Sequence, residues 1–326
     1  MSDPSLTSCR IVSLLPAATE IVWALGLKEQ LVGRSHECDQ PPEVVCLPSL
    51  TRSKIDASAS SRRIHEAVAE AFANPKGDSG CAGASTSLYS LDIARLAALK
   101  PDVILTQAAC EVCAISANDV VRAVEASGHE AHILALSPAT LADVFNDIVR
   151  VGDATGTLNK AREVVARLRA RVDSVACRVT AIGRVSGSDR PRVAIIEWLD
   201  PPMAAGNWVP ELVRLAGGHD LFGKAGEHSD WIRSEDLAAA DPDLIVLSPC
   251  GFTLKRVQAE AASLEFRVQL QKLRAFREGR VYAVDGHHLF NRPGPRLVES
   301  LEVLAELFYP GAFRFCATEK FAAIVA

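Results

Sequence analysis

The residues best suited to chemistry in this sequence are two cysteines three positions apart, Cys110 and Cys113. Thiolates at this spacing can hold a metal ion or form a redox pair, but one pair supplies only two ligands. Thiol and imidazole groups in other segments can complete a metal site: Cys38, Cys250, His36, His287 and His288. Such a mixed set suits zinc or iron. The alternative is that Cys110 and Cys113 are small buried side chains at the end of a strand.

Three of the four tryptophans lie in the second half of the chain: Trp198, Trp208 and Trp231. Aromatic faces suit a large flat ligand such as a corrin or another tetrapyrrole, because stacking buries much apolar area at a small entropic cost. Each tryptophan can instead fill a local core. This alternative is equally good for Trp208, which opens a predicted helix.

Two polar segments offer further binding groups. His36, Glu37, Cys38 and Asp39 follow one another in a predicted loop, where they can act as a base or bind ligand amides or a cation. No Ser-His-Asp arrangement or carboxylate pair can be placed around them from sequence, so a simple polar loop is the alternative. Arg292 can contact an anionic or amide group, but the Pro and Gly residues beside it also set the turn into the last predicted helix.

Composition excludes several classes of function. The formal charge is 35 − 40 = −5 without a concentrated Lys/Arg run, so nucleic-acid binding is not expected. No apolar run approaches the roughly 20 residues of a membrane span. Nine cysteines, an odd number without a regular framework, argue against a disulfide scaffold.

The elements that must position these groups are short strands alternating with helices. In the first half, strands are predicted at 10–15, 31–33, 101–106 and 132–136, and helices at 16–25, 62–73, 92–99 and 118–127. Pro16 suits the first turn of a helix and Gly26 suits a helix end. Residues 74–85 are small and polar, which predicts a surface loop. The alternation implies a mostly parallel sheet with helices on both faces.

Residues 140–179 carry helical signals over an unusual length. Gly152 and Gly156 weaken the middle, so the segment is one long helix or two stacked pieces. A loop of this length is uncommon in a compact domain, which favours a helix that bridges two parts of the chain.

The two halves of the chain repeat one order of elements. Ser90-Leu-Asp92, a helix and Lys100-Pro-Asp102 before a strand match Ser234-Glu-Asp236, a helix and Asp241-Pro-Asp243 before a strand. Each half also begins with a strand, a Pro-containing loop, a helix and a glycine. A repeat that keeps its order over several elements indicates two similar structural units.

We therefore predict two α/β lobes with mostly parallel sheets, 1–139 and 181–326, joined by a bridging helix at 140–180. The carboxyl ends of parallel strands share one edge of a sheet, and ligands bind at the loops that follow them. Two such lobes predict a ligand in the cleft between them.

Five stretches in order resemble the class III solute-binding proteins of ABC importers, specifically their cobalamin-binding branch. They are residues 15–21, 87–92 with 99–105, 198–206, 217–222 with 229–231, and 290–299. Among them are Trp198-Leu-Asp-Pro-Pro-Met-Ala-Ala-Gly206 and Phe290-Asn-Arg-Pro-Gly-Pro-Arg-Leu-Val-Glu299. The resemblance covers residues 10–308. Segments 35–39 and 106–114 resemble a subgroup without an export signal that is usually labelled cobalamin-binding.

The resemblance implies a class III periplasmic-binding-protein-like fold, with two Rossmann-like lobes around a rigid helix. It implies non-catalytic binding of cobalamin, a related corrinoid or another metal chelate, and an ABC transporter permease as partner. The implied ligand-binding residues are Pro16, Ala17, Ala18, Thr19, His36, Glu37, Trp198, Met203, Trp208, Trp231 and Arg292. Importer-linked relatives dock through one acidic residue on each lobe. The nearest positions here, Asp92 and Glu235, also suit helix N-termini, and we prefer that interpretation.

Two other hypotheses stay open. One is an enzyme or metal chaperone that uses Cys110 and Cys113 with Cys38, Cys250 or His36, which requires these donors to converge on one point. The other is a scaffold whose cleft has lost its ligand. The first residues lack the basic and apolar segments of a signal peptide, so we expect a cytoplasmic protein as written, or a periplasmic one if the true start lies upstream.

Overall fold

The computed structural model describes residues 9–73, 88–107, 115, 117–186, 190–263 and 267–325. The chain divides into two compact units. Unit 1 comprises residues 1–59, 63–137 and 145–165, and unit 2 comprises residues 60–62, 138–144 and 166–326. Both are α/β structures with mostly parallel sheets, which confirms the predicted fold class. The predicted domain boundaries at 139 and 181 stay a prediction.

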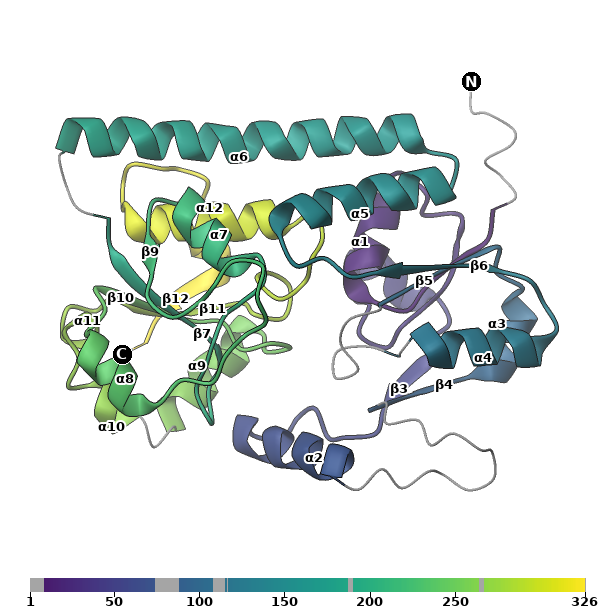
Figure 1. Cartoon of the computed structure of the whole chain (residues 1–326), viewed down its shortest axis with the longest axis horizontal. Helices are drawn as coiled ribbons and strands as arrows, with labels where there is room; N and C mark the ends of the chain where they lie inside the picture. Colours follow the sequence, from purple (N-terminus) through teal and green to yellow (C-terminus); the bar gives the residue numbers. More distant parts are fainter. Residues whose placement is uncertain are drawn as a thin grey trace. The chain divides into compact units, whose positions relative to one another are not determined.

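Unit 1 is built, in its described part, on a parallel sheet with the strand order β2-β1-β5-β6. The strands are β1 (Ile11–Ser13), β2 (Leu31–Arg34), β5 (Val103–Gln107) and β6 (His132–Leu136). The helices are α1 (Pro16–Ala24), α3 (Ile93–Leu99), α4 (Ala117–Ser127) and α5 (Leu141–Ala154). α1 and α5 lie on one side of the sheet, and α3 and α4 on the other (Figure 1). Val12, Leu96 and Ile104 belong to the buried core.

Three smaller elements complete unit 1. β3 (Thr51–Ser53) and β4 (Tyr89–Leu91) form an antiparallel ribbon, and η2 (Pro42–Cys46) is a short 3-10 helix. The helix predicted at 62–73 is present as α2 (Ser61–Ala73), although its apolar stripe is only partly covered. The loop predicted at 74–85 lies wholly outside the described residues.

The long helical segment predicted at 140–180 is two helices, α5 and α6 (Leu158–Ser186), which is the second of the two alternatives that the sequence left open. Gly156 adopts a φ of +70° between them, a left-handed conformation that favours glycine. At Gly152 an added Cβ would lie 2.4 Å from the Cβ of Ala161, so glycine lets the two helices approach closely. No helix in the described part of the chain is both long and apolar enough to cross a membrane.

Unit 2 contains a larger sheet with the order β12-β11-β10-β7-β8, and β9 also pairs with β7. The strands are β7 (Arg192–Trp198), β8 (Met203–Ala204), β9 (His219–Asp220), β10 (Leu244–Leu247), β11 (Val281–Val284) and β12 (Ala322–Ile324). β7, β9, β10 and β11 run parallel, whereas β8 and β12 are antiparallel edge strands. Sequence reasoning did not identify either edge strand.

The helices of unit 2 cover both faces of this sheet. They are α7 (Val209–Leu215), α8 (Ser234–Ala240), α9 (Leu254–Ser263), α10 (Arg267–Leu270), α11 (Arg274–Arg277), α12 (Leu297–Phe308) and α13 (Ala317–Phe321). α7 and α12 lie on one side, and α8 to α11 lie on the other (Figure 1).

The internal repeat is visible in the hydrogen bonds of both units. In unit 1, the Asp102 carboxylate accepts a hydrogen bond of 2.7 Å from the backbone N of Arg10, just before β1. In unit 2, the Asp243 carboxylate accepts one of 2.7 Å from the backbone N of Arg192, at the start of β7. Lys100 and Asp241, which end the preceding helices, share a left-handed conformation. The repeated Pro-Asp pair therefore joins the first and the third parallel strand of each unit in the same way.

This repeat makes two matched substitutions informative. Asp102→Ala and Asp243→Ala should each lower the free energy of unfolding by about 0.5–1.5 kcal/mol, because each removes the acceptor of a backbone N–H at an exposed strand start. Because the two sites lie in different units, the losses should add within about 0.5 kcal/mol in the double variant. Urea unfolding measures this, and Glu29→Ala, an exposed carboxylate, is the control. No loss in either single variant would contradict the shared role.

Glu306 of α12 anchors the chain that leads into β12. Its carboxylate accepts hydrogen bonds from the backbone N of Phe315, Cys316 and Thr318 and from the Thr318 hydroxyl. Burial raises the pKa of Glu306, but these hydrogen bonds outweigh it, so the pKa lies below its ordinary value. The ionised carboxylate therefore stabilises the C-terminal segment.

Glu306→Gln should lower the free energy of unfolding by about 1 kcal/mol at pH 7. Since the folded pKa is depressed, this stabilisation is present above the ordinary glutamate pKa of about 4.3 and is lost as the pH falls through the folded value. Thermal unfolding from pH 7 to pH 3 should show the two proteins converge in acid. Glu319→Gln, an exposed neighbour in α13, is the control and should show no such convergence. A constant difference across the range would refute the mechanism.

Candidate functional site

Three strand ends of unit 2 meet at one edge of its sheet. β10 pairs in parallel with β7 and with β11, so the carboxyl ends of all three strands point the same way. The loops after them begin at Leu199, Ser248 and Asp285. In α/β proteins, ligands bind at this edge.

Trp198, Met203 and Trp231 form a row across this edge, which we call the tryptophan row. Trp198 pairs with Met203 between β7 and β8, and Met203 pairs with Trp231 in an isolated antiparallel bridge. Residues that face each other on neighbouring strands project their side chains from the same face of the sheet. Three large apolar side chains therefore share one face.

The bridge between Met203 and Trp231 brings their side chains close. Hydrogen bonds flank it on both sides, from Ala204 N to the carbonyl of Asp230 at 2.9 Å and from Ile232 N to that of Pro202 at 3.0 Å. A pair flanked in this way is the non-hydrogen-bonded type, in which side chains approach most closely. Trp231 is 55% exposed, whereas Trp198 and Met203 are half-buried. The row is thus an apolar surface that solvent reaches at one end.

Trp198 is held from behind by Phe252. The two rings meet edge to face with centroids 5.5 Å apart, and Phe252 is buried. The indole Nε1 of Trp198 is buried and has no hydrogen-bond partner in the described part of the chain. An unsatisfied buried donor is uncommon in native structures and calls for a functional explanation.

A buried carboxyl group supports the loop that carries Trp231. Glu197 Oε2 accepts a hydrogen bond of 2.9 Å from Ser229 Oγ, and Ser229 Oγ accepts one of 3.1 Å from Gly206 N. Burial raises the pKa of Glu197, against the opposing effects of Ser229, Gly206 and His228. This network ties the end of β7 to the segment before Trp231.

A second polar cluster, the histidine loop (residues 285–292), follows β11. His288 Nδ1 lies 2.9 Å from Asp285 Oδ2, and Asp285 Oδ1 accepts hydrogen bonds from the backbone N of His287 and His288. His287 Nε2 lies 2.9 Å from Arg292 Nη2. Burial raises the pKa of Asp285, but the hydrogen bonds and charges of His288 and His287 outweigh it and lower the pKa. Asp285 is therefore an ionised acceptor that organises the loop.

The remaining predicted residues of unit 2 differ in their placement. Trp208 is buried and donates from Nε1 to the carbonyl of Phe290 at 2.6 Å, which favours the packing interpretation. Arg292 is also buried and contacts His287. Cys250 is exposed at the carboxyl end of β10. Their roles toward a ligand stay predictions.

In unit 1, the residues of α1 that are predicted to contact the ligand mostly pack in the core. Ala17, Ala18 and Thr19 are buried, and only Pro16 is half-buried. Thr19 Oγ1 donates to Ser13 Oγ at 2.9 Å and lies 3.0 Å from Cys38 Sγ. Ligand contact by these residues stays a prediction, which the burial of three of them does not favour.

The loop after β2 holds the other predicted residues of unit 1. His36 Nδ1 lies 2.7 Å from Thr51 Oγ1, and His36 Nε2 lies 3.3 Å from Glu37 Oε1. The imidazole also contacts the ring of Tyr89, with centroids 5.5 Å apart. Both His36 and Glu37 are half-buried, so they are placed for contact at the carboxyl edge of this sheet.

Of the four cysteines predicted as metal ligands, only Cys38 and Cys250 lie in the described part of the chain. Cys38 is fully buried among the hydroxyls of unit 1, which leaves its thiol little room to approach a metal. Cys110 and Cys113 lie outside the described residues. A cysteine-based metal site therefore stays a prediction, and the burial of Cys38 does not favour it.

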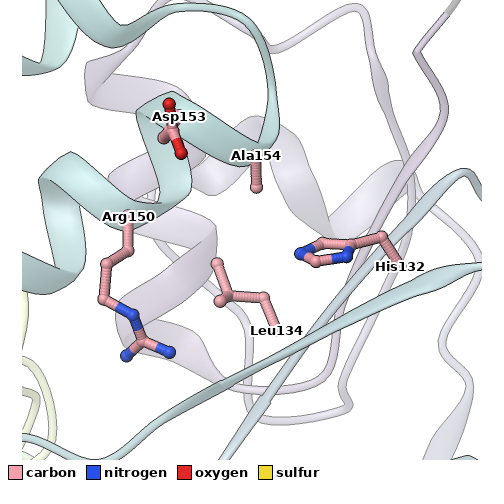
Figure 2. A pocket seen from close by; sticks show the side chains of 5 residues that line it. All are labelled: His132, Leu134, Arg150, Asp153 and Ala154. Carbon is pink, nitrogen blue, oxygen red and sulfur yellow. The ribbon is translucent and has the colours of Figure 1, made fainter.

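A pocket of about 360 Å³ in unit 1 lies away from the predicted residues. Its lining comes from β6 and α5: His132, Leu134, Arg150, Asp153 and Ala154 (Figure 2). Arg150 donates to Asp147 at 2.7 Å and to the carbonyl of Ala135 at 2.9 Å. The first bond lies within α5 and the second ties α5 to the edge strand β6, so Arg150 has a structural role here.

Residues 83–287 match the model of the periplasmic binding protein family. The match covers more than half of the chain. The chain belongs to this family. The predicted resemblance to class III solute-binding proteins is thereby confirmed, and family members bind solutes rather than catalyse reactions.

Two relatives cover most of the chain. The uncharacterized ABC transporter substrate-binding lipoprotein YvrC of Bacillus subtilis is 25% identical over 312 residues, 94% of this chain and 81% of that protein. The cobalamin-binding protein of Halobacterium salinarum is 24% identical over 306 residues, 92% of this chain and 69% of that protein.

Solved structures show the same fold. A periplasmic heme-binding protein from Pseudomonas aeruginosa matches with a TM-score of 0.68 and 23% identity, over 93% of this chain and 94% of that one. The periplasmic vitamin B12-binding protein BtuF of Vibrio cholerae matches with a TM-score of 0.62 and 20% identity, over 92% of this chain and 96% of that one.

Sequence reasoning missed the supports of the tryptophan row, namely Glu197, Ser229 and Phe252. Each lies next to a predicted loop residue or inside a loop expected at the sheet edge. Glu197 precedes Trp198 at the end of a predicted strand, and this position is the signal that could have found it. Ser229 carries no such signal, because its role depends on the antiparallel strand β8.

Gly206 gives a direct test of this support. A Cβ there would lie 2.6 Å from both Glu227 O and Ser229 N, so Gly206→Ala must displace the backbone before Trp231. We expect a loss of about 1–3 kcal/mol in the free energy of unfolding, together with a changed tryptophan emission. Gly183→Ala, in an open position on α6, is the control and should not destabilise the protein. Equal stability of the Gly206 variant and wild type would show that the close approach is unimportant.

Proposed function

We propose that this protein is a non-catalytic solute-binding protein that binds cobalamin or a related metal-containing tetrapyrrole on the tryptophan row. The observation that carries the proposal is the register that puts Trp198, Met203 and Trp231 on one face at the carboxyl edge of the sheet. A flat macrocycle is the ligand class that such a surface suits.

The energetics of the row support this ligand class. A tryptophan side chain buries about 150–250 Å² when it is covered completely. Since Trp231 is 55% exposed, covering it removes on the order of 100 Å² from water. At about 25 cal/mol per Å², this corresponds to roughly 2–3 kcal/mol from one residue. Met203 adds a flexible apolar contact that adapts to the shape of a ring.

Polar groups near the row supply acceptors and donors for the edge of the ligand. The buried indole N–H of Trp198 has no acceptor in the described part of the chain, so a side-chain rotation that exposes it would let it donate to a carboxylate or amide oxygen of the ligand. The relative named for binding cobalamin and the solved structure named for binding heme both favour a metal-containing tetrapyrrole as the ligand. Cobalamin is our first choice, because the relative from Halobacterium salinarum is named for cobalamin and that from Vibrio parahaemolyticus for vitamin B12.

A permease partner follows from the same relatives. YvrC is named as an ABC transporter substrate-binding lipoprotein, so we propose that this chain delivers its ligand to an ABC transporter permease. That role requires the protein on the outer side of the membrane. The acidic residues considered for docking have local roles as well: Asp92 accepts a hydrogen bond from Arg95 N at 2.9 Å, and Glu235 lies in the first turn of α8.

Titration of the purified protein with aquocobalamin and with hemin tests the binding. At least one should quench tryptophan fluorescence in a saturable way. Trp198→Ala and Trp231→Ala should each weaken binding about tenfold or more, the equivalent of 1.4 kcal/mol. Trp23→Phe, on α1 of unit 1, is the matched control and should bind like wild type.

Two results would contradict the proposal. One is the absence of saturable quenching with both ligands at high micromolar concentration. The other is unchanged affinity in both Trp198 and Trp231 variants, which would place the ligand elsewhere even if it binds.

A further inference from the structure

The histidine loop contains one residue in a strained backbone conformation. Phe290 adopts a φ of +40°, in the left-handed region that a bulky side chain rarely occupies. Its side chain is 0% exposed, so the ring cannot leave its place in the core without a loss of apolar contacts. Strain of this kind persists only where surrounding groups hold the backbone, and it is concentrated at functional sites.

Two side chains hold the backbone of Phe290 in this conformation. The indole Nε1 of Trp208 donates to the carbonyl of Phe290 at 2.6 Å, and the backbone N of Phe290 donates to Ser300 Oγ at 3.0 Å. Trp208 directly precedes α7 and Ser300 lies in α12, two helices on the same side of the sheet (Figure 1). The peptide groups on both sides of the strained residue are therefore fixed from outside the loop.

Trp208 also belongs to the backbone that supports the tryptophan row. Its neighbour Asn207 donates from the backbone N to the carbonyl of Glu227 at 2.6 Å and accepts at its own carbonyl from Gly226 N at 2.9 Å. These two bonds hold the chain that leads to Trp231. The residue that holds the histidine loop is therefore adjacent to the residue that holds the loop before Trp231.

The acceptor of the indole N–H distinguishes this link from simple packing. A buried tryptophan usually finds some hydrogen-bond partner for its N–H. Here the partner is the carbonyl of the strained residue, 82 positions later in the chain and in the loop after a different strand. Loss of this bond would remove one of the two groups that hold Phe290 and favour relaxation of its backbone toward a negative φ.

The linked segments lie on either side of the central strand of the sheet edge. The tryptophan row begins at the end of β7 and the histidine loop follows β11, and both strands pair with β10. A ligand that covers the row and extends past the end of β10 meets both segments, so their relative placement determines how well it fits. A surface that is rigid before binding loses less conformational entropy when the ligand binds.

Resting on the proposed function, we propose that Trp208 is a positioning residue whose indole N–H joins the tryptophan row and the histidine loop into one preformed binding surface. Trp208 acts through Phe290 and not by contact with the ligand, because its side chain is buried and offers the ligand almost no surface. This role differs from that of Trp198 and Trp231, which stack on the ligand in the proposed function.

Fluorescence titration of the full-length protein tests the link, with aquocobalamin or hemin as the probe, whichever wild type binds more tightly. Trp208→Phe removes the N–H and should raise Kd about 2- to 12-fold, the equivalent of 0.5–1.5 kcal/mol for one hydrogen bond. Trp23→Phe is the matched control and should bind like wild type. A second variant carries 3-benzothienylalanine at position 208, which keeps the shape of the indole but replaces its N–H by sulfur, and it should raise Kd to a similar extent.

Hydrogen exchange followed by mass spectrometry separates positioning from a general loss of stability. Peptides that cover residues 285–296 should exchange faster in both variants at position 208, because the loop opens locally without its link. Peptides that cover β7 and β10 should keep the protection they have in wild type. In wild type, a saturating concentration of the probe should slow exchange in residues 285–296.

The outcomes distinguish this proposal from the proposed function. Saturable binding with an unchanged Kd in both variants would overturn the positioning role and leave the proposed function standing. Weaker binding in Trp208→Phe alone would show that the volume of the ring matters and not its N–H, which also overturns the role. Faster exchange in β7 and β10 as well would reveal a general loss of stability and have the same consequence. Absence of saturable quenching in wild type with either probe would overturn both proposals.

Discussion

In unit 2, the backbone hydrogen bonds that pair β10 in parallel with β7 and β11 determine which strand ends meet. Because these bonds fix the direction of all three strands, Trp198, Cys250 and Asp285 follow their strands at a common edge. The antiparallel pairing of β8 with β7 then extends this edge sideways and adds Met203 and, through one bridge, Trp231. A change in any of these registers by one residue would turn the row to the opposite face of the sheet.

Exposing the apolar side chains of the tryptophan row to solvent is energetically unfavourable. Hydrogen bonds behind the row restrain the backbone that carries them. Apolar side chains at a solvent-facing edge would collapse onto the core unless the backbone is restrained. Glu197 and Ser229 restrain it by hydrogen bonds, and Gly206 permits the close approach that these bonds require. Desolvation raises the pKa of the Glu197 carboxyl group, and its hydrogen bond to Ser229 opposes this effect.

Much of this arrangement followed from the sequence, and the failures have physical causes. The strands at 10–15 and 101–106, Pro16 as a helix start and the repeated Pro-Asp pairs all depend on local or periodic signals, and the structure shows each of them, with strand bounds shifted by one or two residues. The break between α5 and α6 was left open, because two glycines weaken a helix without deciding whether it ends. β8 has only two residues and forms through pairing with distant segments, so no local pattern predicts it. For the same reason, Trp198 and Trp231 were predicted singly and not as one surface.

The tryptophan row and the histidine loop supply different kinds of selectivity. Stacking on Trp198 and Trp231 depends on flat apolar area, so a row of this kind accepts many macrocycles with similar affinity. Polar groups of fixed orientation depend on the polar groups of the ligand, and therefore discriminate among ligands of equal area. Relatives of one fold are named for cobalamin and for heme, which fits a shared platform beside a variable polar loop. In this chain, Asp285 fixes the orientation of His288 in the loop after β11, so the polar loop beside the apolar row has a defined conformation.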